Sequence, residues 1–254
     1  MDFFQLLFTW DGFMYFIILS LLEIVLGIDN IIFISIVTDK LEKTDQRKAR
    51  NIGLSLALIV RLILLAIVSW IMGMTSVLFT VFSQEISGQD IVLLSGGLFL
   101  IYKSTVEMHS SIMGHEEDTS KVKKTLRAII TQIVLIDIVF SFDSIITAIG
   151  MTNGLGEESG HSPIVIIYAA VIVSMIVMMM FAKPISDFIN NRPTIKMIAL
   201  GFLVTIGVIL VAEAFDQHIP KGYIYFAMVY SLAVEFLNLR MRKNRKEGQK
   251  EENE

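Results

Sequence analysis

The residues Glu23–Ile32, which read EIVLGIDNII, decide how this chain folds. They place two carboxylates and a carboxamide inside an apolar run that extends from Phe13 to Val37. As a helix this run is about 37 Å long at about 1.5 Å per residue, which exceeds the roughly 30 Å hydrocarbon core of a bilayer. Acidic side chains at that depth cost on the order of 2.5–3.5 kcal/mol each, so they indicate a function.

A near copy of this stretch occurs later in the chain, at Asp137–Ile146, which reads DIVFSFDSII. Five of the ten positions are identical. In both stretches an acidic residue is followed six positions later by Asp, then by a small polar residue and by Ile-Ile. The two stretches therefore indicate an internal repeat, and each is called an acidic motif below.

The composition predicts an all-α polytopic membrane protein. Apolar residues make up 54% of the 254 residues, and the mean hydropathy is +0.67. The absence of cysteine excludes thiolate metal sites and cysteine nucleophiles. No nucleotide-binding signature is present. We therefore expect a protein that works in the lipid bilayer, is not an enzyme and binds no nucleic acid.

Seven hydrophobic segments reach or approach the roughly 20 residues that a spanning helix needs. They lie at about 13–37, 49–73, 89–107, 127–151, 163–182, 196–214 and 221–239. We expect residues 1–239 to form a single membrane domain and residues 240–254 to form a charged cytoplasmic tail.

The positive charges between these segments predict the orientation of the chain. Of the 21 Lys and Arg residues, 18 lie in the connections 38–50, 108–127 and 183–196 or in the tail, whereas the other connections hold only Lys221. Cytoplasmic loops carry the excess of positive charge. The N-terminus is therefore expected outside and the C-terminus in the cytoplasm.

Because three crossings separate the two motifs, the halves of the chain would have opposite orientations. Repeat one would span about 13–107 and repeat two about 127–214, with 221–239 as an extra seventh helix. Inverted repeats are typical of secondary transporters, which bind substrate near the midplane where the repeats meet.

The six-residue spacing within each motif predicts that the first and fourth helices are interrupted. On a continuous helix, residues six apart point about 240° away from each other. Two carboxylates of one motif would converge more easily if the helix unwound at Gly27 and at Ser141. Broken helices also expose backbone carbonyls to a bound ion.

Together the motifs supply oxygen donors for a hard divalent cation such as Mg²⁺, Ca²⁺ or Mn²⁺. When the site is empty, burial and mutual repulsion favour protonated carboxyl groups. Metal binding would release those protons, which allows proton-coupled exchange. The predicted metal ligands are Glu23, Asp29, Asn30, Asp137, Asp143 and Ser144.

Other charged residues in the segments have two open interpretations each. Arg61 is either a structural counter-ion for one carboxylate or a gate. Lys103 and Glu107, four residues apart, form either an interfacial pair or a gate. Glu213 and Glu235, near helix ends, either lie at the membrane interface or line a path to the site.

At these residues the sequence resembles the TerC family of integral membrane proteins. The resemblance rests on the Glu-x-x-Leu-Gly-x-Asp-Asn and Asp-x-x-Phe-Ser-x-Asp-Ser patterns of the motifs and on Glu235–Asn238. It implies Mn²⁺ export from a bacterial cell membrane, supply of metal to exported metalloproteins, and the motif acids as metal ligands. It leaves open whether Ca²⁺ or Mg²⁺ is also carried.

Two other functions fit the same residues. An intramembrane aspartyl protease also places two Asp residues on neighbouring helices, but such enzymes share a Gly-x-Gly-Asp pattern, and here Leu26 stands at the first glycine position. A non-transporting assembly factor could use the site to sense metal or to hold secretion machinery. Metal flux into vesicles would separate transport from assembly.

Overall fold

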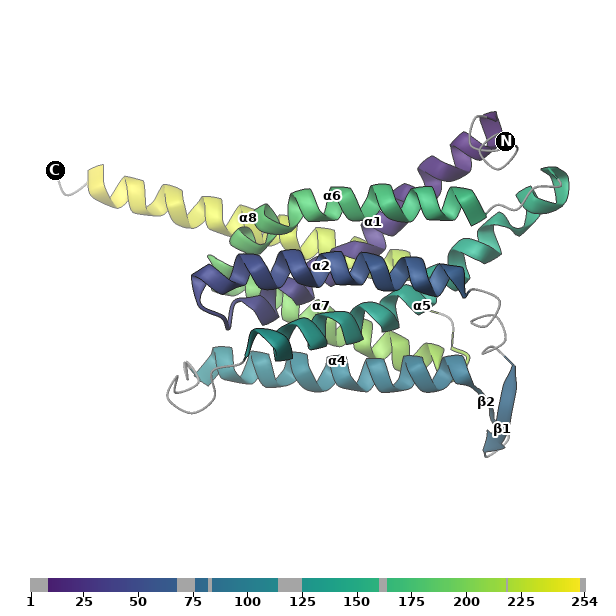
Figure 1. Ribbon diagram of the computed structural model, residues 1–254. Coiled ribbons are helices and arrows are strands. Elements are labelled where there is room, and N and C mark those ends of the chain that lie inside the picture. Colours follow the sequence, from purple (N-terminus) through teal and green to yellow (C-terminus); the bar gives the residue numbers. More distant parts are fainter. Residues whose placement is uncertain are drawn as a thin grey trace.

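The computed structural model describes residues 9–67, 76–81, 84–113, 125–159, 164–217 and 219–251. Long helices dominate this part of the chain, and a small hairpin stands beside them (Figure 1). The helices are α1 (Trp10–Thr38), α2 (Lys43–Ala66), α4 (Gly88–Met113), α5 (Leu126–Ser159), α6 (Ile164–Asn190), α7 (Pro193–Glu213) and α8 (Lys221–Glu251). The strands are β1 (Val77–Val81) and β2 (Gln84–Ser87).

Seven helices are long and apolar enough to cross a membrane, which confirms the predicted fold class. Each coincides with one predicted segment, although residues 68–73 of the second segment lie outside the described residues. Local signals fix two of the helix starts. The Thr9 hydroxyl caps α1 by accepting a hydrogen bond from the backbone N–H of Gly12 at 3.1 Å, and Pro193 occupies the first turn of α7.

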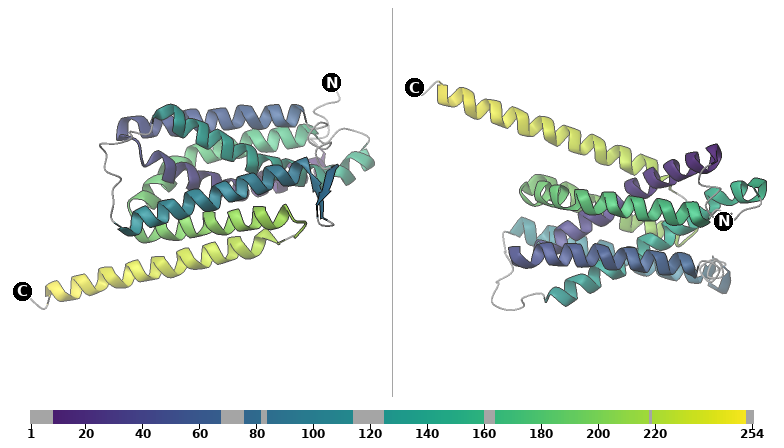
Figure 2. Two further views of the ribbon diagram at one scale, coloured as in Figure 1. Left: turned by 90° about the horizontal axis from the view of Figure 1, so that it is seen from below. Right: turned by 45° about the horizontal axis from the view of Figure 1, so that its top comes forward.

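Two elements differ from the sequence expectation. The connection between α2 and α4 contains an antiparallel hairpin, β1 paired with β2, although alternation in this short stretch is too weak to predict a sheet. Helix α8 continues to Glu251, through most of the segment expected as a charged tail. Figure 2 shows this part of α8 extending away from the other helices.

The helices pack in the pattern that two inverted repeats require. The most extensive contacts join α1 to α6, α4 to α7 and α2 to α5. If the repeats are equivalent, α1 corresponds to α5, α2 to α6 and α4 to α7. Under this correspondence the α1–α6 contact becomes the α5–α2 contact, and the α4–α7 contact becomes itself. The helix α8 lies outside this exchange and packs mainly on α7.

The contact between α4 and α7 depends on a glycine from each repeat. A Cβ atom on Gly97 would lie 2.7 Å from the carbonyl oxygen of Gly207, and a Cβ atom on Gly207 would lie 2.8 Å from that of Gly97. The absence of both side chains lets the two backbones touch, as small residues do between membrane helices. Each glycine thus makes room for the backbone of the other.

The prediction of interrupted helices is wrong. Helix α1 is continuous through Gly27, and α5 is continuous through Ser141. The glycine serves packing instead: a Cβ atom on Gly27 would lie 2.0 Å from the sulfur of Met178 on α6. The Ser141 hydroxyl binds Asp137 on its own helix, so it stabilises the turn that was expected to open.

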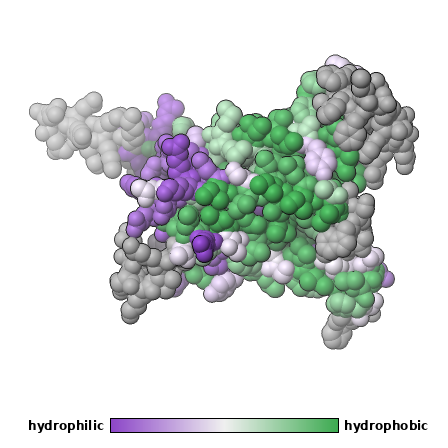
Figure 3. Space-filling view, viewed as in Figure 1, coloured by the Kyte–Doolittle hydropathy of each residue, from purple (hydrophilic) through white to green (hydrophobic). Residues whose placement is uncertain are grey.

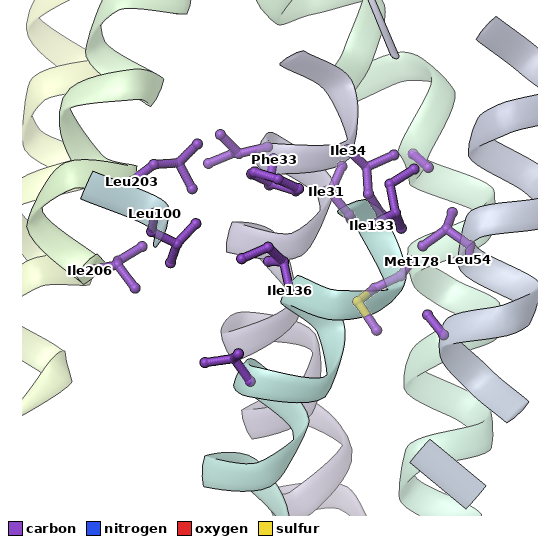
Figure 4. Close-up of a cluster of buried hydrophobic side chains, with 14 of the residues drawn as sticks. Ile31, Phe33, Ile34, Leu54, Leu100, Ile133, Ile136, Met178, Leu203 and Ile206 are labelled. Carbon is purple, nitrogen blue, oxygen red and sulfur yellow. The ribbon is translucent and has the colours of Figure 1, made fainter. Parts of the chain in front are cut away.

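The bundle has one polar end and an apolar middle. Hydrophilic side chains gather at the end where α1 ends and α2 begins (Figure 3). This end, which carries Lys40 and Lys196, is called the basic end below. The interior is filled by aliphatic side chains from several helices, with Ile136 and Phe33 near its centre (Figure 4). The polar residues of the motifs are therefore enclosed by apolar walls.

Candidate functional site

Arg61 of α2 lies at the centre of a buried ion network that joins the two acidic motifs. Its Nη1 atom is 2.5 Å from Glu23 Oε2, and its Nη2 and Nε atoms are 3.2 and 3.3 Å from Asp137 Oδ1. All three residues are at most 3% exposed. Because buried charges persist only when they are paired, Arg61 is the counter-ion of the first acid of each motif.

Further hydrogen bonds hold Asp137 in place. The Asn30 amide donates to Asp137 Oδ1 at 2.9 Å, and the Ser141 hydroxyl donates to Oδ2 at 3.1 Å. Asn30 Oδ1 and Glu23 Oε1 are buried and accept no hydrogen bond from the described residues. Such orphaned acceptors are rare inside proteins, and a cation or a water molecule would satisfy them.

The second acid of each motif faces a cavity and not the Arg61 ion network. Asp29 of α1 and Asp143 of α5 line the same cavity of about 30 Å³. A space of this size can hold a water molecule. The other lining residues are Leu26, Arg61, Phe140, Ser144, Ile206, Ile209, Leu210, Ile224 and Tyr225. This space is called the central cavity below.

Tyr225, near the start of α8, closes one side of the central cavity. Its hydroxyl lies 3.4 Å from Asp29 Oδ2, the distance of a long hydrogen bond. Sequence reasoning missed this residue, because a tyrosine near a membrane interface ordinarily serves as an anchor. Helix α8 thus adds one polar group to a site otherwise built from the two repeats.

The spacing within the motifs explains why the acids separate into two groups. Residues six apart on a continuous helix point about 240° away from each other. On α1 this turns Glu23 toward Arg61 of α2 and Asp29 toward the cavity wall formed by α7 and α8. The same spacing on α5 turns Asp137 toward Arg61 and Asp143 toward the cavity.

The six predicted ligands are therefore not gathered at one point. Among the described residues, no three His, Asp or Glu side chains are grouped so that they could hold a metal ion. Asp29, Asp143 and Ser144 share the central cavity, whereas Asn30 and the first acids belong to the Arg61 network. Their role as metal ligands stays a prediction.

The remaining charged residues lie near the ends of the bundle. The spacing of Lys103 and Glu107 predicted a pair, but Glu107 forms its ion pairs with Lys40 and Lys196 instead. Lys103 Nζ instead lies 5.7 Å from the centre of the Phe99 ring.

The two other glutamates lie on α7 and α8. Glu213 is half-buried at the last residue of α7. Glu235 is buried between α7 and α8, where it accepts hydrogen bonds from Thr194 at 2.5 Å and from Asn238 at 3.4 Å.

Comparison with known proteins connects this architecture to a family. Residues 8–250 match the integral membrane protein TerC family. The chain is 50% identical over 227 residues to the "UPF0053 protein" of Haemophilus influenzae and to the "UPF0053 inner membrane protein YgdQ" of Escherichia coli K12, covering 89% of this chain and 92% of each relative. It is 44% identical to the "UPF0053 inner membrane protein YoaE" of Escherichia coli K12 over 92% of this chain and 43% of that protein.

No solved structure matches the chain. The family match nevertheless covers all seven spanning helices and both acidic motifs. This multi-pass membrane protein belongs to the TerC family of integral membrane proteins.

Proposed function

We propose that this protein is a secondary transporter that exports Mn²⁺ from the cytoplasm, with Asp29 and Asp143 as the carboxylates that hold the ion. Protons move in exchange, and the exported metal supplies metalloproteins outside the cytoplasm. The protein carries out no chemical reaction on its substrate. The choice of Mn²⁺ over Ca²⁺ and Mg²⁺ rests on the family resemblance, since oxygen ligands suit all three ions.

One observation carries the proposal: a carboxylate from each repeat lines the same buried cavity. Asp29 and Asp143 come from equivalent positions of two oppositely oriented helices, which is where inverted-repeat transporters bind their substrate. Ser144 adds a hydroxyl oxygen to the same space. Carbonyl oxygens and water would complete the coordination of a hard cation.

The Arg61 network supports proton exchange at this site. The four motif acids carry four negative charges when ionised, and Arg61 neutralises one of them. Carboxylates of the two motifs that face a common space repel one another, and a divalent cation or protons relieve that repulsion. Metal binding would displace those protons, so the affinity for Mn²⁺ should fall as the pH falls.

The charge of the loops indicates at which end an exported ion would enter. The positive residues gather at the basic end, and this end is assigned to the cytoplasm. An ion that leaves the cell therefore passes from the basic end to the central cavity and on toward the end that carries β1 and β2.

The cavity argues against the protease alternative. Two aspartates do face one space, as they do in an aspartyl dyad. However, the space is small, about 30 Å³, and mostly apolar side chains line it. A metal-sensing assembly factor would use the same ligands without transport, so only a flux measurement separates it from an exporter.

The test is Mn²⁺ flux into proteoliposomes that contain the purified protein and an internal Mn²⁺-sensitive dye. The wild-type protein should carry Mn²⁺ with an opposing proton flux. Asp143→Asn keeps the shape of the side chain but removes its charge, and it should abolish the flux.

The matched control is Asp45→Asn, which changes an exposed aspartate of α2 that pairs with Lys48. It should transport at the wild-type rate. Bound Mn²⁺ without flux in the wild-type protein would establish the assembly role instead. Equal flux in the Asp143→Asn and wild-type proteins would refute the proposed site.

A further inference from the structure

A second cavity, of about 40 Å³, lies closer to the basic end of the bundle. It is called the inner cavity below. Its walls combine polar and charged side chains with apolar ones. They are Phe33, Ile36, Val37, Lys40, Lys103, Ser104, Val106, Glu107, Ile129, Gln132, Leu200 and Leu203. No function described above uses this space.

The two cavities lie along the same three helices. On α7 the central cavity is lined by Ile206 and Leu210, and the inner cavity by Leu200 and Leu203, about one turn nearer the basic end. Helices α1 and α5 show the same order, because each contributes residues to both cavities. The cavities are therefore successive spaces on one line through the bundle.

Apolar side chains border both spaces where they come closest on α7, with Leu203 lining the inner cavity and Ile206 the central cavity. Figure 4 shows Phe33 and Ile136 close to Leu100, Leu203 and Ile206. These residues are each at most 9% exposed. Such an apolar constriction blocks an ion until the helices move apart and water enters.

A group of ion pairs closes the inner cavity at the basic end. Glu107 of α4 forms an ion pair with Lys40, which follows α1. Lys196 of α7 lies 2.9 Å from Asp39 and 3.9 Å from Glu107. The group connects three helices, and its side chains are 12–32% exposed, so it stands between the cavity and solvent.

Ser104 provides an independent indication that this cavity becomes hydrated. The residue is 2% exposed, and its hydroxyl forms no hydrogen bond with the described residues. A buried hydroxyl without a partner is destabilising. Water that enters the cavity when it opens would satisfy this group.

The Asp39–Lys40 pair is not repeated in the sequence of the second repeat. In the register of the acidic motifs, Asp39 and Lys40 correspond to Asn153 and Gly154. These two charged residues are therefore specific to the first repeat, whereas the two motifs are shared by both repeats.

We propose that the inner cavity is the cytoplasmic antechamber of the cation path and that the Asp39–Lys196–Glu107–Lys40 group is its gate. The inference rests on the proposed transport function. When the gate opens, the two lysine ammonium groups move into solvent and leave two carboxylates facing the passage. A hydrated divalent cation then reaches the apolar constriction below the central cavity.

The test uses the absence of cysteine from the chain, because one introduced thiol can be labelled without background. Ser104→Cys is nearly isosteric and places a thiol in the inner cavity. The protein is labelled with a membrane-impermeant maleimide in vesicles that expose either the basic end or the opposite end. Ile112→Cys, at a residue that is 69% exposed on the same helix, serves as the reference for an accessible thiol.

Ser104→Cys should be labelled slowly, and only in vesicles that expose the basic end. Adding Lys40→Gln or Lys196→Gln should increase its rate about tenfold or more. Lys196→Gln removes the partner of Asp39, and Lys40→Gln leaves Glu107 only its longer contact with Lys196. The matched control is Lys48→Gln, which removes an exposed lysine of α2 and should not change the rate. The rate at Ile112→Cys should stay the same in all variants.

Two results would overturn the gate: equal rates for the Lys40→Gln, Lys196→Gln and Lys48→Gln variants, or labelling from the opposite face. The readout does not depend on which ion is carried. If Mn²⁺ flux is absent but the gate variants are labelled faster, the assignment of Mn²⁺ as the transported ion is refuted and the proposed gate is supported. If Mn²⁺ flux is intact but the labelling rate is unchanged in the gate variants, only the proposed gate is refuted.

Discussion

The first and second acids of each motif occupy opposite situations, although the sequence gives them the same spacing. Glu23 and Asp137 are held by Arg61 at 2.5 and 3.2 Å. Asp29 and Asp143 instead face a cavity that the Arg61 side chain reaches from one side. A repeated pair of acids can thus form two layers. The first layer, Glu23 and Asp137, fixes the helices around a counter-ion, and the cavity layer, Asp29 and Asp143, lines a shared space.

The largest effect is expected from removal of the counter-ion. Arg61→Met should destabilise the protein by about 3–5 kcal/mol, because it leaves two buried carboxylates without a cation. The measurement is thermal unfolding of the purified protein in detergent. Adding Glu23→Gln and Asp137→Asn to the same chain should recover most of the loss, since the unpaired charges are then absent. A single Arg61→Met variant as stable as the wild type would contradict the assigned role of the first layer.

A smaller loss is expected where the two repeats touch away from the motifs. Gly97→Ala would place a methyl group 2.7 Å from the carbonyl oxygen of Gly207, so α4 and α7 must separate. Overpacking of this kind costs about 1–3 kcal/mol. Gly201→Ala is the control, because a Cβ atom there meets nothing within 4 Å. Equal unfolding temperatures for the two variants would mean that the close contact between the repeats is not needed.

The smallest effect is expected from loss of the tyrosine hydroxyl that contacts one of the two acids of the cavity layer. Tyr225→Phe removes the hydroxyl that lies 3.4 Å from Asp29. Loss of one long hydrogen bond costs about 1 kcal/mol, so the Mn²⁺ dissociation constant should rise about fivefold. Tyr223→Phe, at a residue 73% exposed on the same helix, should leave binding unchanged. The same affinity in both variants would show that Tyr225 only fills space.

The fold was predictable because a bilayer imposes strong constraints on sequence. Length and hydropathy located all seven helices, and the motif repeat indicated the inverted arrangement that the α1–α6 and α2–α5 contacts now match. The tail was misjudged because charge alone does not show that a helix will end. Helix α8 has no proline or capping glycine at residue 240, so it continues.

The site was only half predictable. The motifs identified the acids, but a helix break was assumed to bring them together. The 240° turn between residues six apart was evident in the sequence, and it directs the acids to different neighbours without any break. The identity of these neighbours depends on tertiary contacts, because Arg61 and Tyr225 come from helices far away in the chain. The Lys40–Glu107 pair at the basic end likewise joins distant parts of the chain.

The most direct test of the division between the layers compares Mn²⁺ binding and thermal stability in four single variants of the purified protein. Asp29→Asn and Asp143→Asn should weaken Mn²⁺ binding by about 100-fold or more with little change in unfolding temperature. Glu23→Gln and Asp137→Asn should lower the unfolding temperature and weaken binding much less. Loss of Mn²⁺ binding in Glu23→Gln and Asp137→Asn, with binding retained in Asp29→Asn and Asp143→Asn, would contradict the account.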